Sequence, residues 1–357
     1  MSSLIFKKQL VIAGPCSAEN EAQVLLTAQQ LKLTGKVDLL RAGVWKPRTS
    51  PGGFEGAGVK ALAWLAKAKQ ETGLPFTVEV ATSSHVEDAL GFDTDVLWIG
   101  ARTTVNPFSV QNVADALRGS NATVLIKNPV NADIKLWIGA VERLQKVGIT
   151  NIGLIHRGFT SYGSTEYRNV PLWQIPIEMM RLFPTFPMIC DPSHICGRRD
   201  TLMKVMQKSI DLAYTGLMVE AHNDPEIALT DKMQQVTPSQ LNTMLEALVW
   251  KKDNNGAEDF KAQIEHLREQ INYVDDELLT LIANRMRIAK EIGVLKQAHN
   301  VTIFQQNRWN EIRERMLCRA KELDLSEDFV NTYLEAIHIE SIRIQNFSKS
   351  NIYAIKD

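Results

Sequence analysis

Four side chains that could bind a metal lie far apart in this sequence of 357 residues. They are a thiol, an imidazole and two carboxylates: Cys16, His194, Glu220 and Asp231. This mixed set suits Zn, Mn, Fe or Co better than Mg or Ca, which prefer oxygen ligands alone. Each residue also has an ordinary structural alternative, such as a buried thiol, a hydrogen-bonded imidazole or a solvated carboxylate. A metal site therefore requires a fold that brings all four to one place.

The segment MICDPSHICG at residues 188–197 places Cys190, His194 and Cys196 close together in sequence. A local metal clip, a redox pair and one corner of a larger site are all compatible with this spacing. If the apolar residues 188–190 form a strand, His194 is the ligand candidate at its C-terminal end. We expect Cys190 to pack in the core and Cys196 to be a loop thiol near the site.

Six basic residues lie in or just after segments that we expect to be buried, where an unpaired charge is costly. They are Arg41, Lys46, Arg48, Arg102, Lys127 and Arg157. Structural salt bridges are one explanation, and Glu79 could serve one of them. Because the cations outnumber the nearby carboxylates, we favour dianionic ligands, with arginine giving bidentate contacts to phosphate or carboxylate. The KPRTSPGG segment adds hydroxyl and amide groups that suit a phosphate.

Eight short apolar segments between residues 10 and about 222 carry most of these side chains. They are LVIAGPCSA, VDLLRAGVWKP, PFTVEVAT, VLWIGART, TVLIKNP, NIGLIHRG, MICDPSH and GLMVEAH. Most are nearly continuous in apolar residues, which is typical of parallel strands buried on both faces. Helical patterns alternate with them, at 19–33, 58–72, 109–118, 132–147, 172–182 and 199–212.

This alternation predicts an α/β fold, a (β/α)8 TIM barrel over residues 1–250. The C-terminal ends of barrel strands converge on one face, where active sites are built. Each apolar segment ends in a residue able to bind a metal or an anion. We therefore expect one barrel mouth to hold Cys16, Lys46, Glu79, Arg102, Lys127, Arg157, His194 and Glu220.

A polar stretch at 251–258 predicts a linker, and the apolar spacing then becomes heptad-like. Residues 259–357 are predicted to form a small all-α domain of three helices, at 259–298, 305–322 and 326–347. The first helix would be roughly 60 Å long, too long for its own chain to bury, so we expect a homodimer. Arg285 falls on the apolar seam of that helix, where it either extends to solvent or meets a buried anion. Lys296 shares its face, whereas Arg268 lies roughly 100° away.

Composition limits the partners of this chain. Lys and Arg number 40 against 41 for Asp and Glu, so no global charge favours nucleic acid or anionic membranes. No apolar run approaches roughly 18 residues, and the first residues do not resemble a signal peptide. The four cysteines are too sparse for a disulfide framework. We expect a cytoplasmic protein without nucleic-acid or membrane partners.

Seven motifs over residues 10–240 resemble the 3-deoxy-D-arabino-heptulosonate 7-phosphate (DAHP) synthases, in particular the short barrel type related to the 3-deoxy-D-manno-octulosonate 8-phosphate synthases. The motifs are GPCS, RAGVWKPRTSP, IGAR, LIKNP, HRG, DPSHICGRRD and VEAHNDPEIALTD. The resemblance implies a metal-dependent condensation of phosphoenolpyruvate with erythrose 4-phosphate. Octulosonate synthases remain the alternative, but that family carries Asn-Arg where this chain has Pro47-Arg48. The KPRTS segment therefore favours the four-carbon aldose.

By position, the resemblance implies a role for each matching residue of the barrel. Cys16, His194, Glu220 and Asp231 would be the ligands of a divalent metal. Arg102, Lys127 and Arg157 would surround the phosphate of phosphoenolpyruvate, and Arg41 and the catalytic Lys46 would lie near its carboxylate. Arg48 and Thr49 would hold the phosphate of erythrose 4-phosphate.

Residues 264–347 contain the segments LREQINYVDDELLTLIANRMRIAKEIGVLK, NRWNEIRER and IHIESIRIQ. These segments resemble the all-helical chorismate mutases, which are intertwined dimers with shared active sites. By position, Arg285, Lys296, Arg308, Ser341 and Gln345 would line one site, and Arg268 would reach into the site of the partner chain. Lys296 and Gln345 would stabilise the charge that develops on the breaking ether oxygen. The family often has Asp and Glu where this chain has Gln305 and Trp309, and Trp309 cannot accept a hydrogen bond as a carboxylate does.

Mutase activity would then be weak alone, or Trp309 points elsewhere. The helices could instead be a purely structural dimerisation module, and the barrel a degenerate sugar-phosphate binding protein. A further hypothesis is that the helical domain senses a product such as prephenate and inhibits the barrel.

Overall fold

The structure is a computed structural model that describes residues 4–46, 52–162, 166–250 and 258–353. The chain divides into two compact units, Met1–Asp253 and Asn254–Asp357, and each is described by itself. Arg48 and Thr49 lie outside the described residues, as does the predicted linker except for its last position.

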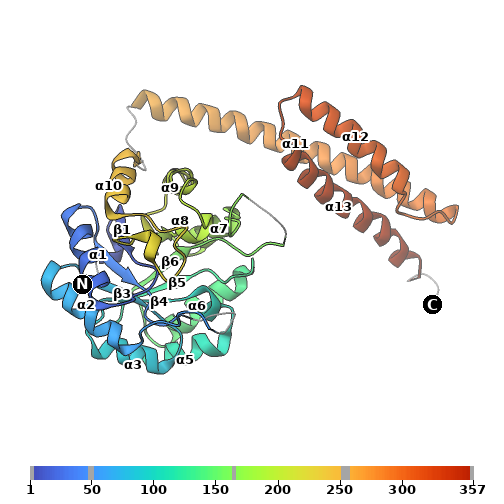
Figure 1. The fold of residues 1–357 in the computed structure, drawn as a ribbon. Coiled ribbons are helices and arrows are strands. Elements are labelled where there is room, and N and C mark those ends of the chain that lie inside the picture. Colours follow the sequence, from blue (N-terminus) through green and yellow to red (C-terminus); the bar gives the residue numbers. More distant parts are fainter. Residues whose placement is uncertain (1–3, 47–51, 163–165, 251–257, 354–357) are drawn as a thin grey trace. The chain divides into compact units, whose positions relative to one another are not determined.

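The first unit is a closed barrel of eight parallel strands in sequential order, in which β8 pairs with β1 (Figure 1). The strands are β1 (Leu10–Gly14), β2 (Leu39–Ala42), β3 (Phe76–Val80), β4 (Val96–Ile99), β5 (Val124–Lys127), β6 (Ile152–His156), β7 (Met188–Cys190) and β8 (Gly216–Glu220). Every strand residue except Glu79 is buried, as expected for parallel strands covered on both faces. The predicted barrel is confirmed.

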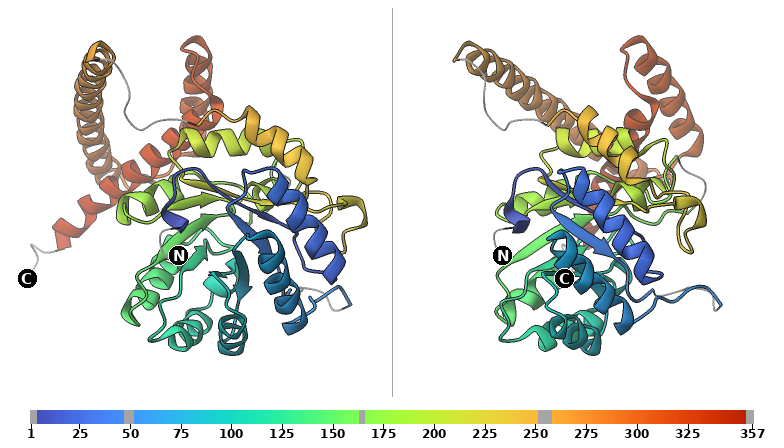
Figure 2. Two further views of the ribbon diagram at one scale, coloured as in Figure 1. Left: turned by 90° about the vertical axis from the view of Figure 1, so that its left-hand side faces the viewer. Right: turned by 60° about the vertical axis from the view of Figure 1, so that its left-hand side comes forward.

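Helices surround the strands, and Figure 2 shows this ring from two further sides. They are α1 (Glu21–Leu33), α2 (Val59–Thr72), α3 (Ser83–Gly91), α4 (Ala101–Thr104), α5 (Pro107–Leu117), α6 (Ile134–Lys146), α7 (Gln174–Leu182), α8 (Pro192–Cys196), α9 (Leu202–Asp211) and α10 (Pro238–Ala247). Two short 3-10 helices, Leu4–Phe6 and Pro225–Ile227, complete the unit. Local signals set the helix starts: Asn20 caps α1, and Thr237 forms a capping box with Gln240 at α10.

The interior of the barrel is filled by apolar side chains that form a floor under the mouth. Trp98 and Ile5 belong to this cluster and are fully buried. Trp98, on β4, donates a hydrogen bond from Nε1 to Glu79 Oε2 at 3.0 Å. The indole therefore supports the polar residues that lie around it.

Two of the residues predicted at the C-terminal ends of strands lie instead in short helices that follow those strands. Arg102 lies in α4 and His194 lies in α8, each directly after its strand. Cys196 was expected in a loop, but it is the last residue of α8 and is 2% exposed, so that expectation is wrong. Gly197 (φ +68°) ends the helix in the left-handed region and leaves Cys196 facing the core. Cys190 is buried in the core, as predicted.

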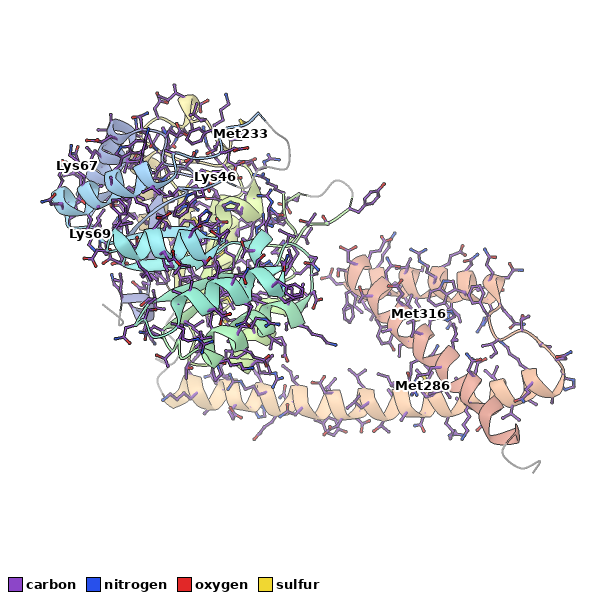
Figure 3. All side chains as sticks on the ribbon, turned by 90° about the horizontal axis from the view of Figure 1, so that it is seen from below. Lys46, Lys67, Lys69, Met233, Met286 and Met316 are labelled. Carbon is purple, nitrogen blue, oxygen red and sulfur yellow. The ribbon has the colours of Figure 1, made fainter. Side chains whose placement is uncertain are left out.

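The second unit contains α11 (Glu258–Ala298), α12 (Gln306–Glu322) and α13 (Glu327–Tyr353) (Figure 1). Apolar side chains such as Met286 of α11 and Met316 of α12 pack between these helices (Figure 3). Gly293 allows a close approach of α13, since a Cβ atom there would lie 2.9 Å from the Gln345 Cα. Across the described ranges, no helix combines the length and apolarity needed to cross a bilayer.

Candidate functional site

Three donor side chains of the predicted metal set lie at the barrel mouth within 4.8 Å of one another: those of Cys16, Glu220 and Asp231. The Cys16 thiol donates to Asp231 Oδ2 at 3.5 Å. His194 joins the group through Nε2, which lies 3.7 Å from Glu220 Oε1. The fold therefore brings together four side chains that come from the turn after β1, α8, β8 and the loop after β8. We call these four residues the donor cluster.

Glu220 provides the clearest sign that the donor cluster is built for a cation. Its carboxylate is fully buried, and Oε1 accepts no hydrogen bond within the described part of the chain. That oxygen lies 3.2 Å from Arg41 Nη2, an ion pair without hydrogen-bond geometry. Buried oxygens nearly always accept a hydrogen bond, so one that accepts none beside a thiol, an imidazole and a second carboxylate fits a metal ligand.

Cys16 is a protonated thiol when no metal is bound. Burial, and then the negative charge of Glu220, raise its pKa to about 12. The Lys46 ammonium, which donates to Sγ at 3.3 Å, opposes this effect without cancelling it. A divalent cation at the donor cluster would stabilise the thiolate and release the proton.

The orientation of His194 is fixed by a buried carboxylate that the sequence analysis missed. Asp191 caps α8 and accepts from the His194 backbone N–H, and its Oδ2 lies 2.8 Å from Nδ1 of the imidazole. Nε2 is thereby left facing Glu220. Burial opposes ionisation of Asp191, but His194 and Lys127 outweigh it and hold its pKa well below the usual range. A carboxylate that accepts from the second ring nitrogen of a histidine commonly orients that histidine as a metal ligand. The Asp-Pro-Ser-His sequence, which is typical of a helix N-cap, was the pattern from which Asp191 could have been predicted.

A pocket of about 370 Å³ adjoins the donor cluster and shares His194 with it. Four basic side chains line it: Arg102, Lys127, Arg157 and Arg168. Burial, and then the charges of Arg168 and Arg102, lower the pKa of Arg157 to about 10 against the opposing effect of Asp191. A bound dianion would relieve this repulsion, so the pocket suits a phosphate. We call it the anion pocket.

Arg41 and Lys46 lie elsewhere at the mouth, beside Cys16 rather than among the residues that line the anion pocket. Arg41 is 1% exposed, its guanidinium carbon lies 5.2 Å from the centre of the Trp98 ring, and Nε and Nη1 lack acceptors among the described residues. Lys46 folds across Gly43, where a Cβ atom would lie 2.3 Å from Nζ. These two cations leave donors free for an anion near the donor cluster.

The helical unit has its own pocket, of about 600 Å³. All the predicted mutase residues except Arg268 line it: Arg285, Lys296, Arg308, Ser341 and Gln345. Arg285 Nη1 donates to Ser341 Oγ at 2.6 Å, and Lys296 Nζ donates to the Ile303 carbonyl at 2.6 Å. The buried Oε1 of Gln345 has no hydrogen-bond donor in the part of the chain that the structure describes.

The two positions that depart from the mutase pattern also line this pocket. Trp309 stacks on His338 of α13 with ring centres 4.1 Å apart, so it forms part of the wall. Gln305 lies just before α12 and makes no side-chain cap hydrogen bond. Arg268 lies away from the pocket, 3.3 Å from Glu265, with 68% of its side chain exposed.

Comparisons with known proteins agree with both resemblances. Residues 7–257 match the DAHP synthetase I family, and residues 267–346 match chorismate mutase type II. A phospho-2-dehydro-3-deoxyheptonate aldolase from Thermotoga maritima is 32% identical over 226 residues, covering 63% of this chain and 64% of that protein. A 2-dehydro-3-deoxyphosphooctonate aldolase from Syntrophotalea carbinolica is 28% identical over 259 residues, covering 67% and 89%.

Solved structures give the same result for the barrel. The crystal structure of the Thermotoga maritima aldolase (DAHP synthase) has a TM-score of 0.60 at 29% identity, covering 67% of each chain. A truncated 3-deoxy-D-arabino-heptulosonate 7-phosphate synthase from the same organism has a TM-score of 0.58 at 27% identity, covering 67% of this chain and 84% of that one. This chain therefore belongs to the DAHP synthetase I family, and it continues into a C-terminal chorismate mutase type II domain.

Proposed function

We propose that the protein is a bifunctional enzyme. The barrel would condense phosphoenolpyruvate with erythrose 4-phosphate to give DAHP and phosphate, and the helical domain would convert chorismate to prephenate. The observation that carries the proposal is the adjacency of the donor cluster to the cation-lined anion pocket, with His194 common to both. Metal-assisted addition of a phosphorylated nucleophile to an aldehyde needs both features.

The donor cluster would hold a divalent metal: Mn, Fe, Co or Zn fit its thiolate, imidazole and carboxylates. When bound, the metal would act as a Lewis acid on the aldehyde oxygen. Lys46, whose Nζ is 3.3 Å from Cys16 Sγ, is the cation best placed to act beside it. We retain it as the catalytic lysine of the proposal.

The basic residues would hold the two anionic substrates in register. Arg102, Lys127 and Arg157 would bind the phosphate of phosphoenolpyruvate, and Arg41 and Lys46 its carboxylate. Arg48 and Thr49 would bind the phosphate of erythrose 4-phosphate. The vinyl carbon then attacks the aldehyde, water adds at C2 and phosphate leaves. Fixing both substrates lowers the entropic cost of bringing two anions together.

In the helical pocket, Arg285 and Arg308 would bind the carboxylates of chorismate, and Ser341 would hold Arg285 in place at 2.6 Å. Lys296 and Gln345 would donate to the ether oxygen as its bond breaks. No covalent intermediate is required. We expect low mutase activity, because the Trp309 indole stands where the family often supplies a carboxylate.

We also propose a homodimer through the helices. Leu267, Ile271, Val274, Leu278 and Leu281 of α11 are each at least half exposed, and a second copy would cover them. Arg268, which lies on the same stretch of helix, would then enter the partner's pocket. Since the Cys16 thiol must stay reduced to bind a metal, we place the enzyme in the cytoplasm.

Prephenate is proposed as an inhibitor of the barrel activity that acts through the helical pocket. Adding prephenate to the full chain and to an Arg285→Ala variant tests this directly. Inhibition of the wild type with loss of inhibition in the variant is expected. Equal inhibition of the two proteins would exclude the helical pocket as the effector site.

The substrate assignment is tested by phosphoenolpyruvate consumption with erythrose 4-phosphate and, in parallel, with arabinose 5-phosphate. We expect turnover with the four-carbon aldose. Preference for arabinose 5-phosphate would favour an octulosonate 8-phosphate synthase, the activity named for several relatives of similar identity. For the helical unit, chorismate loss that is unchanged in Arg285→Ala would indicate a structural domain.

A further inference from the structure

Arg168, on the segment between β6 and α7, lines the anion pocket and also contacts the donor cluster, and no substrate contact is assigned to it. Its Nη1 lies 3.0 Å from Asp231 Oδ1 and 2.8 Å from Gln234 Oε1. The second Asp231 oxygen, Oδ2, faces the Cys16 thiol at 3.5 Å. The guanidinium therefore holds one carboxylate oxygen and leaves the other directed into the donor cluster.

Gln234 extends this contact to a second carboxylate. Its Nε2 donates to Glu220 Oε2 at 2.7 Å in a buried hydrogen bond. Because Oε1 of the same amide accepts from Arg168, the amide has only one orientation that satisfies both partners. Glu220 Oε1, the oxygen that accepts no hydrogen bond in the described residues, is thereby turned toward the donor cluster. One arginine thus sets the orientation of two carboxylates, Asp231 directly and Glu220 through Gln234.

Backbone hydrogen bonds hold the segment that contains Arg168 against α8, the helix that carries His194. The Arg168 and Asn169 amides donate to the carbonyls of Cys196 and Ile195, at 3.3 and 3.1 Å. A Cβ atom at Gly197 would lie 2.6 Å from the Arg168 Cβ, so the stem packs where only glycine leaves room.

Asn169 makes a parallel set of contacts. Its Nδ2 donates to the His194 carbonyl at 2.6 Å, and its Oδ1 accepts from Arg157 Nη1 at 2.8 Å. The pair Arg168–Asn169 therefore connects three members of the donor cluster to a cation of the anion pocket. Of the two, Arg168 alone contacts the carboxylate side.

We propose that Arg168 is a positioning residue that presets Asp231 and Glu220 for the metal. The inference rests on the proposed metal-dependent function. Two effects oppose each other, because orientation strengthens metal binding whereas a nearby positive charge weakens it. Orientation prevails, since Arg168 pairs with Asp231 Oδ1 and leaves Oδ2 and Glu220 Oε1 toward the donor cluster.

The test is a titration of the metal-free full chain with Mn²⁺ alone, with free Mn²⁺ measured by electron paramagnetic resonance. Arg168→Met is expected to bind Mn²⁺ about 10- to 100-fold more weakly than wild type, the usual loss when a support of metal ligands is removed. Arg198→Met is the matched control, because that arginine pairs with Asp200 at the surface and should leave the affinity unchanged.

Two more variants separate orientation from charge and from loss of fold. Arg168→Lys keeps the charge but loses the planar fork, so we expect an affinity between those of wild type and Arg168→Met. Gln234→Leu should also weaken binding. The double variant Arg168→Met/Gln234→Leu should lose less Mn²⁺ binding free energy than the two single variants lose in sum, since both substitutions act on Glu220. Melting curves of each variant verify the fold.

Unchanged or tighter Mn²⁺ binding by folded Arg168→Met would overturn the inference, because the arginine would then be a bystander or a competitor for Asp231. If Arg168→Met does not fold, the two single variants Arg168→Lys and Gln234→Leu decide instead. Wild-type Mn²⁺ affinity in both of them would overturn the inference. Failure of the wild type to bind Mn²⁺ would instead overturn the metal site itself, and this inference with it.

Discussion

Asp191 is a buried carboxylate shared by the Lys127 ammonium and the His194 imidazole, and replacing it with asparagine tests how the barrel mouth is held together. Its Oδ2 lies 2.7 Å from Lys127 Nζ and 2.8 Å from His194 Nδ1, and its side chain is fully buried. The Asp191→Asn substitution would keep the shape of the side chain and remove its charge. Lys127, only 4% exposed, would lose the ion pair that compensates its burial.

Breaking a buried pair from one side costs about 3–5 kcal/mol, since the remaining charge stays buried without its partner. For a unit of this size, each kcal/mol shifts the melting temperature by about 2–4 °C, so the barrel transition of Asp191→Asn should move down by about 6–20 °C. Scanning calorimetry of the full chain measures this shift. Metal affinity should also fall about 10- to 100-fold, because His194 loses its support.

Asp115→Asn provides the control for Asp191→Asn. That residue pairs with Arg118 at the surface, where both side chains are at least half exposed and ion pairs contribute little. The melting temperature of this variant should stay close to that of wild type. If Asp191→Asn also melted within about 2 °C of wild type, the view that Asp191 compensates the charge of Lys127 would be wrong.

Three further predictions concern single residues. Burial lowers the pKa of His156 to about 3, so between about pH 6.5 and 3 only the unfolded chain binds a proton at this imidazole. The free energy of unfolding of the wild type should therefore fall by about 1.4 kcal/mol per pH unit as the pH drops through this range. Urea titrations at several pH values should show a shallower slope for His156→Gln. Gly43→Ala should displace Lys46 and the Cys16 carbonyl, which would lie 2.3 and 2.5 Å from the new Cβ atom, so phosphoenolpyruvate consumption should be abolished and the melting temperature should fall; retained turnover would contradict the assigned packing of Lys46 and Cys16 around Gly43. Gly293→Ala should shift Gln345 and slow chorismate turnover while the barrel reaction continues at the wild-type rate; equal loss of both activities would count against a local effect.

The barrel could be predicted from the sequence because its strands are buried on both faces. Segments such as Val96–Ile99 and Val124–Lys127 are almost entirely apolar, and the parallel topology then places their polar ends at one mouth. The helix Ser83–Gly91 was not predicted: it spans only nine residues, and only Val86 and Ala89 of that segment are buried.

The supports of the site were harder to predict than its ligands. Asp191 meets Lys127 across 64 positions of sequence, and Arg168 meets Asp231 across 63. Such pairs depend on which strand ends become neighbours, and no local spacing encodes them. The stacking of Trp309 on His338 likewise joins two helices whose relative rotation follows from packing.

The central claim is that the donor cluster binds a metal on which condensation depends. The most direct measurement is the rate of phosphoenolpyruvate consumption with erythrose 4-phosphate by the full chain, before and after chelation, with metal content determined in the same samples. The rate should fall to background as the metal is removed and return when Mn²⁺ is added. Undiminished turnover by protein shown to be free of metal would contradict the claim.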